Sequence, residues 1–187
     1  MGKLEGKLAW KILMIATPQF DFRHSTWQST VLFALGFWLS GSLILDLLIM
    51  PSLYGSGIMK QPDFVIAGYS IFWLFNRFEL LCGALILTGL LALRHQRNRF
   101  SIIANASKSR WPLFLSLLLF AIALIYTYIL TPDMSSLGLQ LNLFESGSEV
   151  PAGMNQLHGL YWGLELMKLA AGGILFRFCY REAVSSL

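Results

Sequence analysis

Four long apolar segments constrain this chain more than any other feature of its sequence. They run over about 29–50, 66–93, 112–130 and 157–178, and each is near or above the ~20 residues that a helix needs to cross a bilayer. The second segment is the longest, so we expect its helix to tilt. The pattern predicts an all-α fold, a four-helix transmembrane bundle in which residues 29–178 form one membrane domain.

The composition agrees with an integral membrane protein. Of the 187 residues, 56% are hydrophobic and only 13% are charged, whereas soluble domains are about 45–50% apolar and ~25% charged. The formal net charge of +4 is distributed by side of the membrane, so we expect the lipid bilayer as a partner and no nucleic acid. Cys82 and Cys179 lack CxxC spacing and are interpreted as small apolar residues.

The basic residues between the segments predict the orientation of the chain. Eleven lysines and arginines fall on one side of the membrane: Lys3, Lys7, Lys11, Arg23, Arg94, Arg97, Arg99, Lys108, Arg110, Arg177 and Arg181. Only Lys60 lies in a loop on the other side. The positive-inside rule therefore predicts that both termini are cytoplasmic, with 179–187 as a tail. In the N-terminal segment, 1–28, we expect a short interfacial helix with its lysines toward the headgroups.

The ends of the segments suggest further boundaries. We expect the first helix to stop at Pro51, because proline removes a backbone donor. The stretch 131–156 is acidic and rich in small residues, so it is expected to form a flexible external lid. Aromatic residues near segment ends are interpreted as interfacial anchors: Trp111, Tyr126, Tyr128 and Tyr161.

Five ionisable residues lie inside the apolar segments, and they are the best clue to function. They are Asp46, Arg77, Glu79, Glu165 and Lys168. A charge at the centre of a membrane helix costs about 2.5–3.5 kcal/mol on insertion scales, so such residues usually face the protein interior. Glu165 and Lys168 can pair along their own helix at i,i+3. One hypothesis is therefore that their ion pair only permits insertion.

The fourth segment carries two different faces. At 100° per residue, one stripe is polar (His158, Tyr161, Glu165, Lys168) and another is small (Gly159, Gly163, Ala170, Gly173). The small stripe begins with a GxxxG pattern, so Gly159, Gly163 and Gly173 are predicted to serve close helix packing. A homodimer through the first two of these glycines is one form of that packing.

The charged residues are predicted to converge. Arg77 and Glu79 differ by about 200° around the second helix, so they cannot share one face. We expect Arg77 to pair with an acid of another helix, either Asp46 or Glu165. At about 1.5 Å per residue, these groups fall between the membrane centre and its outer face, with His158 at the mouth. Three acids and two bases leave one negative charge, so the cluster is predicted to bind a cation or take up a proton.

The sequence gives less support to a metal site, a haem site or an enzymatic site. A metal site drawing on His158, Glu165, Asp46 and Glu79 has no HxxxH or ExxH spacing, and haem ligation by His158 lacks a second inward histidine. No metal or cofactor is therefore assigned. The sequence has no Ser-His-Asp set, P-loop or dinucleotide fingerprint, so no catalytic residue is assigned and a non-enzymatic role is favoured. An enzyme acting on a lipid or a porphyrin is the remaining enzymatic hypothesis.

Four stretches of the chain carry a resemblance to a known family. They are GFWLSGSLILDLLIMPSLY, FNRFELL, TPDM and LHGLYWGLELMK, one from each segment. They resemble the small four-span proteins of the transmembrane-protein-205-like family, or domain of unknown function 4149, and are most similar to its cyanobacterial members. Over roughly 29–178, the resemblance implies a four-helix membrane fold, no established reaction, and a plasma or thylakoid membrane. It also implies that His158 corresponds to a histidine near the start of the family's last span.

Two functional hypotheses stay open. In the first, the cluster binds or moves a small solute, a metal ion or a proton, and four spans then suggest a homo-oligomer. In the second, the protein is an accessory or assembly factor beside a larger membrane complex, with its charges paired across that interface. The first predicts that Asp46, Arg77 and Glu165 face one another within one chain, whereas the second predicts that some of them face outward.

Overall fold

The computed structural model describes residues 22–57, 64–100, 110–144 and 153–185, and all regular structure within these ranges is helical. The helices form four rods: α2 (Phe22–Ile44), η1 (Leu45–Ile49) and α3 (Met50–Gly55); α4 (Phe64–Phe100); α5 (Trp111–Ile125), η3 (Tyr126–Leu130) and α6 (Thr131–Phe144); and α7 (Met154–Ser185). The predicted all-α fold is confirmed. The interfacial helix predicted for the N-terminal segment lies outside the described residues.

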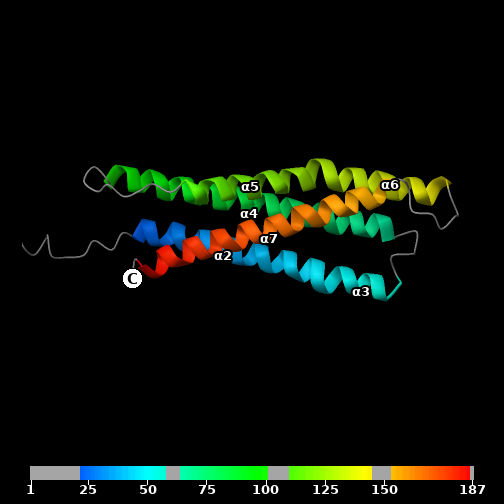
Figure 1. Ribbon diagram of the computed structural model, residues 1–187, viewed down its shortest axis with the longest axis horizontal. Coiled ribbons are helices and arrows are strands. Elements are labelled where there is room, and N and C mark those ends of the chain that lie inside the picture. The colour runs from blue at the N-terminus through cyan, green and yellow to red at the C-terminus, as the bar shows by residue number, and fades with distance from the viewer. Residues whose placement is uncertain (1–21, 58–63, 101–109, 145–152, 186–187) are drawn as a thin grey trace, which may run out of the picture.

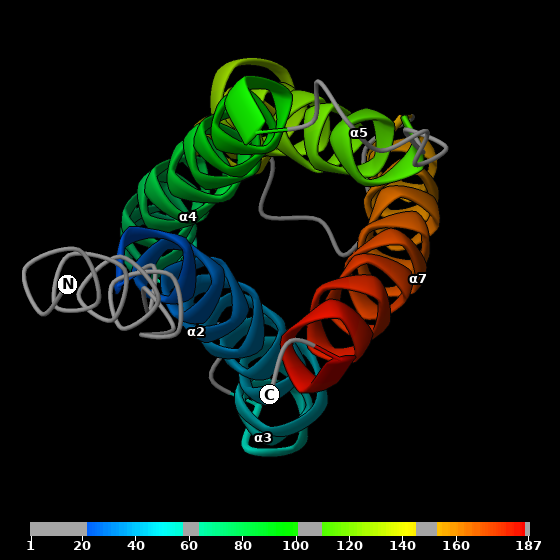
Figure 2. The ribbon, with the colours of Figure 1, turned by 90° about the vertical axis from the view of Figure 1, so that its left-hand side faces the viewer.

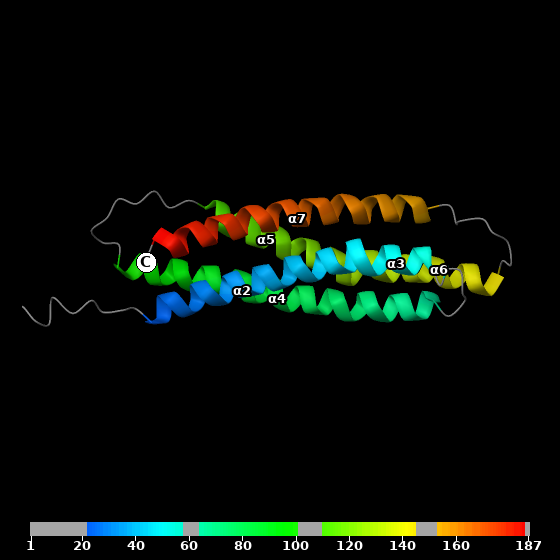
Figure 3. The same ribbon diagram turned by 90° about the horizontal axis from the view of Figure 1, so that it is seen from below.

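The rods run side by side (Figures 1 and 3) and occupy the corners of a square when viewed end-on (Figure 2). The α2 helix contacts α4 and α7, and α5 contacts the same two helices. Consecutive rods are antiparallel neighbours, as expected for a bundle with short connections. The outermost piece of the first rod, α3, has no buried residue.

Three of the rods are long and apolar enough to cross a membrane. Within the described ranges, these candidate spans are Thr26–Gly55, Ile66–His95 and Trp111–Gly138. Such a set is typical of a multi-pass membrane protein. The fourth rod, α7, is 32 residues long but carries Glu165 and Lys168 near its middle, which lowers its hydropathy. Both side chains are buried.

Two predicted helix boundaries are wrong. The first rod does not stop at Pro51 but continues as α3 to Gly55. The third rod continues through Pro132 as α6 (Thr131–Phe144), so most of the predicted external lid is helical. Residues 145–152 of that predicted lid are not described, and its last three residues belong to α7.

A π-helical turn before each proline explains why the rods continue. In η1 the backbone N–H of Met50 donates to the carbonyl of Leu45, and in η3 the N–H of Thr131 donates to the carbonyl of Tyr126. These bonds span one residue more than an α-helical bond. The wider turn makes room for the proline ring, which otherwise clashes with the carbonyl four residues earlier.

The two ends of the bundle have different interiors. Where α2 and α5 begin and α4 and α7 end, twelve buried side chains form a continuous hydrophobic core: Val31, Ala34, Leu35, Trp38, Cys82, Ile86, Leu115, Leu119, Ala123, Ala171, Leu175 and Cys179. We call this the apolar half. The other half holds a smaller cluster, Ile122, Tyr126, Leu130 and Leu164, beside the buried charged residues. We call it the polar half.

The glycines that pack against other helices are not those that the sequence suggested. A Cβ atom on Gly83 would lie 3.1 Å from the Phe120 ring of α5, and one on Gly172 would lie 2.6 Å from Leu39 of α2. Gly159, Gly163 and Gly173 lie on open surface, where an added Cβ would meet no heavy atom of the described residues within 4 Å. Any packing role of these three glycines therefore concerns another molecule.

Candidate functional site

Four charged side chains are buried together in the polar half. They are Asp46 of η1, Glu79 of α4, and Glu165 and Lys168 of α7, and each is at most 4% exposed. Because burying an unpaired ion costs several kcal/mol, their hydrogen bonds decide whether this arrangement is stable. With the polar and aromatic groups that bond to them, described below, they form what we call the polar network.

Lys168 lies at the centre of the polar network. Its Nζ atom is 2.5 Å from Oε1 of Glu79 on the opposite helix α4, and 2.7 Å from Oε2 of Glu165 one turn away on α7. The second contact confirms the i,i+3 pair predicted from the sequence. The ammonium also lies 5.1 Å from the centroid of the Tyr126 ring, within cation–π range. One cation therefore holds two carboxylates from two helices.

The α2 helix supplies two more donors to Glu79. Trp38 Nε1 donates to Oε1 at 2.9 Å and Ser42 Oγ donates to the same atom at 3.3 Å. Trp38, Ser42 and Asp46 are spaced by four residues, so they share one face of the first rod. Sequence reasoning noticed the Ser42–Asp46 spacing but missed Trp38, although the extended i,i+4 pattern was a signal for it.

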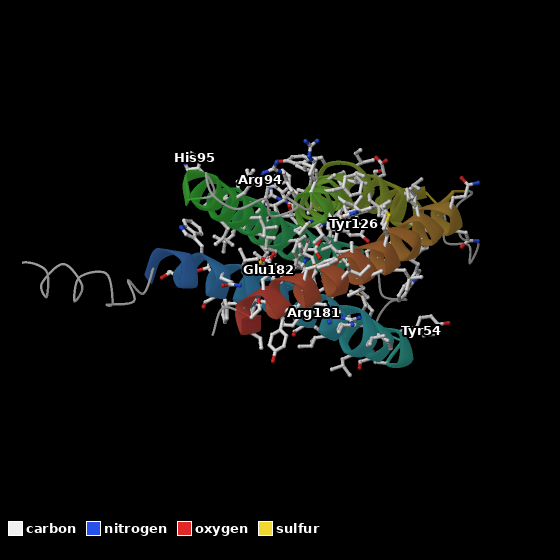
Figure 4. All side chains as sticks on the ribbon, turned by 60° about the vertical axis from the view of Figure 1, so that its left-hand side comes forward. Tyr54, Arg94, His95, Tyr126, Arg181 and Glu182 are labelled. Carbon is white, nitrogen blue, oxygen red and sulfur yellow. The ribbon has the colours of Figure 1, made fainter. Side chains whose placement is uncertain are left out.

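Two tyrosines join the remaining acids to the polar network. Tyr161 donates its hydroxyl hydrogen to Oδ1 of Asp46 at 2.6 Å, and the Tyr126 hydroxyl lies 3.0 Å from Oε2 of Glu165 and 3.1 Å from the carbonyl of Tyr161. The expectation that both tyrosines are interfacial is wrong, because Tyr126 is only 2% exposed and Tyr161 is half-buried. Figure 4 shows Tyr126 between the helices, whereas Tyr54 projects from the far end of α3.

An amide on α4 holds the η3 turn that carries Tyr126. Asn76 Nδ2 donates to Thr131 Oγ1 at 2.6 Å and to the Tyr126 carbonyl at 3.3 Å. The Thr127 hydroxyl lies 2.8 Å from the carbonyl of Ala123 and 3.5 Å from the Asn76 carbonyl, and its single hydrogen can be donated to either. These bonds place the Tyr126 ring against α7 and fix its hydroxyl toward Glu165.

Arg77 is not part of the polar network, contrary to the sequence-based expectation. Its side chain is exposed on the outer surface of α4, and its guanidinium carbon lies 3.6 Å from the centroid of the Trp73 ring. Among the described residues it has no carboxylate partner. The predicted pairing with Asp46 or Glu165 fails because Lys168 takes the inward position opposite α4, while Arg77 is rotated about 200° from the inward-facing Glu79.

His158 also lies outside the polar network. Its ring is exposed near the start of α7, and Nδ1 is 2.9 Å from the carbonyl of Met154 in the preceding turn. In the described part of the chain, no group of three or more His, Cys, Asp or Glu side chains is arranged to hold a metal ion. The ligand set that the sequence analysis considered, His158, Glu165, Asp46 and Glu79, is therefore not assembled among the described residues.

The charges of the polar network do not balance. With Arg77 outside, three acids face one base, so the ionised polar network carries two negative charges rather than the predicted one. Each acid also has one buried oxygen without a hydrogen-bond partner among the described residues: Asp46 Oδ2, Glu79 Oε2 and Glu165 Oε1. Such an excess of buried carboxylates requires a proton or another cation.

Comparisons with models of protein families, with curated proteins and with solved structures find no match to this chain. Its function therefore has to be argued from the polar network itself.

Proposed function

We propose that this protein is a four-span membrane protein whose polar network binds protons within the bilayer. The excess of buried acids carries the proposal, because three buried carboxyl groups face the single ammonium of Lys168 and each keeps one oxygen without a hydrogen-bond partner among the described residues. Ionised carboxylates repel one another and have no hydrogen to donate, whereas a carboxylic acid can donate one. A bound proton therefore removes one of the two excess charges and turns one of these acids into a donor.

A proton suits this site better than a metal ion or a solute. Metal sites in proteins need about four to eight ligand atoms at fixed distances, and the three acids here are separated by Lys168 and the two tyrosines. A proton needs only one carboxyl oxygen without a partner. Tyr126 and Tyr161 already orient one oxygen of Glu165 and one oxygen of Asp46, which leaves the second oxygen of each acid to take up a hydrogen.

The apolar half limits what the polar network can do. Leu35, Ile86, Leu119 and Leu175 fill the bundle interior beyond Trp38, and each is at most 1% exposed. Such packing offers no donors or acceptors for a proton. We therefore propose reversible proton binding from the polar end, and transfer across the membrane would require a rearrangement of the apolar half.

Orientation and family membership are part of the same proposal. The end of the bundle with the apolar half carries several arginines: Arg94, Arg110, Arg177 and Arg181. The positive-inside rule therefore supports cytoplasmic termini and a polar network nearer the outer face.

Three of the four stretches that resemble the transmembrane-protein-205-like family contain acids or the lysine of the polar network. This overlap supports membership of that family.

Infrared difference spectroscopy provides the test. The purified protein in neutral lipid nanodiscs is stepped between high and low pH, and the C=O stretch of protonated carboxyl groups is recorded. We expect Asp46→Asn and Glu165→Gln each to remove a band that the unmodified protein shows. The exposed acid Asp133 provides the control, because Asp133→Asn should leave that band in place.

Two results would contradict proton binding. One is a spectrum of Glu165→Gln that matches the unmodified protein. The other is a rise in thermal midpoint with Mn²⁺ or Zn²⁺ that Glu165→Gln abolishes, which would identify a metal site instead.

One observation favours an accessory role as a second candidate function. The sequence analysis predicted that a docking protein would turn some of its intramembrane charges outward, and Arg77 does so. The two functions are compatible, because Arg77 and the polar network lie on different faces of α4.

A further inference from the structure

The outward face of α4 combines a charge with small and polar side chains. Ser70, Arg77, Ala84 and Thr88 are all exposed, and at 100° per residue they fall within about 40° of one another. We call this stripe the α4 seam. Bulky exposed residues flank it, among them Trp73, Leu74 and Leu81. Small residues let a second helix approach closely, and hydroxyl groups can bond across such a contact.

Arg77 lies too deep in the membrane for its guanidinium group to reach water easily. The candidate span Ile66–His95 has its midpoint between Leu80 and Leu81, so Arg77 lies about 5 Å from the midpoint at ~1.5 Å per residue. The hydrocarbon boundary lies about 15 Å from the midplane, half of a ~30 Å core. A guanidinium at this depth needs a counter-charge, because an unpaired charge near the bilayer centre is costly to insert.

The described part of the chain offers no suitable acid. Among the described residues, Asp46, Glu79 and Glu165 are buried in the polar network, and Glu182 lies near the end of α7. The exposed Asp133 lies within the candidate span Trp111–Gly138, about 13 Å from its midpoint at ~1.5 Å per residue. Of the acids that the structure describes, a second copy of the chain would therefore bring no exposed carboxylate to the depth of Arg77. The phosphate of a lipid headgroup lies beyond the hydrocarbon boundary, and it would leave the small residues of the α4 seam unexplained.

We propose that the α4 seam is the docking surface for a transmembrane helix of another protein. That helix carries an aspartate or glutamate near the middle of the membrane, where it pairs with Arg77 in a charge-assisted hydrogen bond. Its backbone packs over Ser70, Ala84 and Thr88. Trp73 holds the guanidinium at 3.6 Å from its ring centroid and so orients it before the partner binds. The inference specifies the surface for the accessory role and is independent of proton binding.

The test uses a photo-crosslinking amino acid at Leu81, one turn from Arg77, in the native membrane of the cells that make the protein. Leu81 is 68% exposed, and Leu166 on α7, which is 66% exposed, is the matched control position. We expect an adduct with one membrane protein from Leu81 and none with that protein from Leu166. Arg77→Gln should reduce the adduct at least tenfold, whereas Arg77→Lys should retain most of it.

Identification of the partner by mass spectrometry completes the test. The partner should have an acid within a transmembrane helix, and a charge exchange (Arg77→Asp here, with that acid changed to lysine) should restore the adduct. Ala84→Leu, which fills the α4 seam and keeps Arg77, should also abolish it. The proposal is overturned by adducts with phospholipid only or with a second copy, by equal yields from Leu166, or by no adduct at all. Unchanged thermal midpoints of these variants exclude misfolding as the cause.

Discussion

The apolar half and the polar half of the bundle use the same four rods but are held together differently. Leu35 and Leu175 in the first, and Glu79 and Glu165 in the second, are all at most 1% exposed. The leucines need only close packing, which many side-chain arrangements can provide. The acids need donors at defined positions, and they obtain them from Lys168 and its neighbours. The comparison indicates that the polar half, more than the apolar half, specifies how the four rods are arranged.

The backbone differs between the halves as well. The α2 and α5 helices are regular through the apolar half, whereas η1 and η3 interrupt them in the polar half. Asp46 lies in one of these π-turns and Tyr126 in the other. Such turns are frequent at functional sites because they redirect side chains and expose carbonyl groups. The prolines that follow them thus shape the polar network without touching it.

The largest expected effect comes from removing the only cation of the polar network. Lys168→Met leaves Glu79 and Glu165 buried without their counter-charge, so the free energy of unfolding should fall by about 3–5 kcal/mol. Thermal unfolding in detergent, followed by the loss of helical circular dichroism, measures this. Arg177→Met, at an exposed position on the same helix, should have little effect. Adding Glu79→Gln and Glu165→Gln to Lys168→Met should recover stability, and a failure to recover would contradict the electrostatic explanation.

A cavity in the apolar half should lower the free energy of unfolding nearly as much as Lys168→Met, but it should leave proton uptake unchanged. Leu175→Ala should lower the free energy of unfolding by about 2–5 kcal/mol, because Leu175 is fully buried. The neighbouring Ile174 is 50% exposed, so Ile174→Ala should cost far less. Infrared proton uptake should stay unchanged in Leu175→Ala. Loss of that signal in a folded variant would show that the two halves are coupled, and the comparison between them would fail.

The smallest effect is expected from a single hydroxyl group in the polar half. Tyr126→Phe removes the donor to Glu165 and should destabilise the protein by about 1.5–3 kcal/mol, the range for hydrogen bonds to charged groups. Tyr128→Phe is the matched control, because Tyr128 is two residues away and 69% exposed. Equal thermal midpoints for the two variants would show that the Tyr126 hydroxyl contributes nothing to the polar network.

Much of the polar network was accessible to sequence reasoning. Asp46, Glu79, Glu165 and Lys168 stood out because a charge within an apolar segment is expensive, and the i,i+3 pair followed from helix geometry. Spacing placed Tyr161 on the polar stripe with Glu165 and Lys168, whereas Trp38 was missed and Tyr126 misplaced, because aromatic residues are compatible with lipid, interface and core alike. Nothing in the spacing of Tyr126 says which of these environments it occupies.

Arg77 shows what helical periodicity in the sequence cannot determine. Sequence reasoning separated Arg77 and Glu79 correctly onto different faces of one helix, but it could not say which of the two faces inward. That choice depended on Lys168, which lies 91 positions further along the chain on α7 and occupies the place opposite Glu79. Periodicity determines relative angles within a helix, whereas its absolute rotation is set by its neighbours.

The sequence alone therefore determined the helical class, the number and approximate extent of the rods, and a set of five intramembrane charges, four of which are buried. Its apolar runs and the cost of charge in lipid act locally, so no partner is needed to interpret them. The tertiary structure alone decided which charges meet, that the rods continue past Pro51 and Pro132 after a π-helical turn, and that Arg77 stays outside. Those outcomes depend on contacts between residues far apart in the chain, where one rod supplies the donor, the space or the counter-charge that another requires.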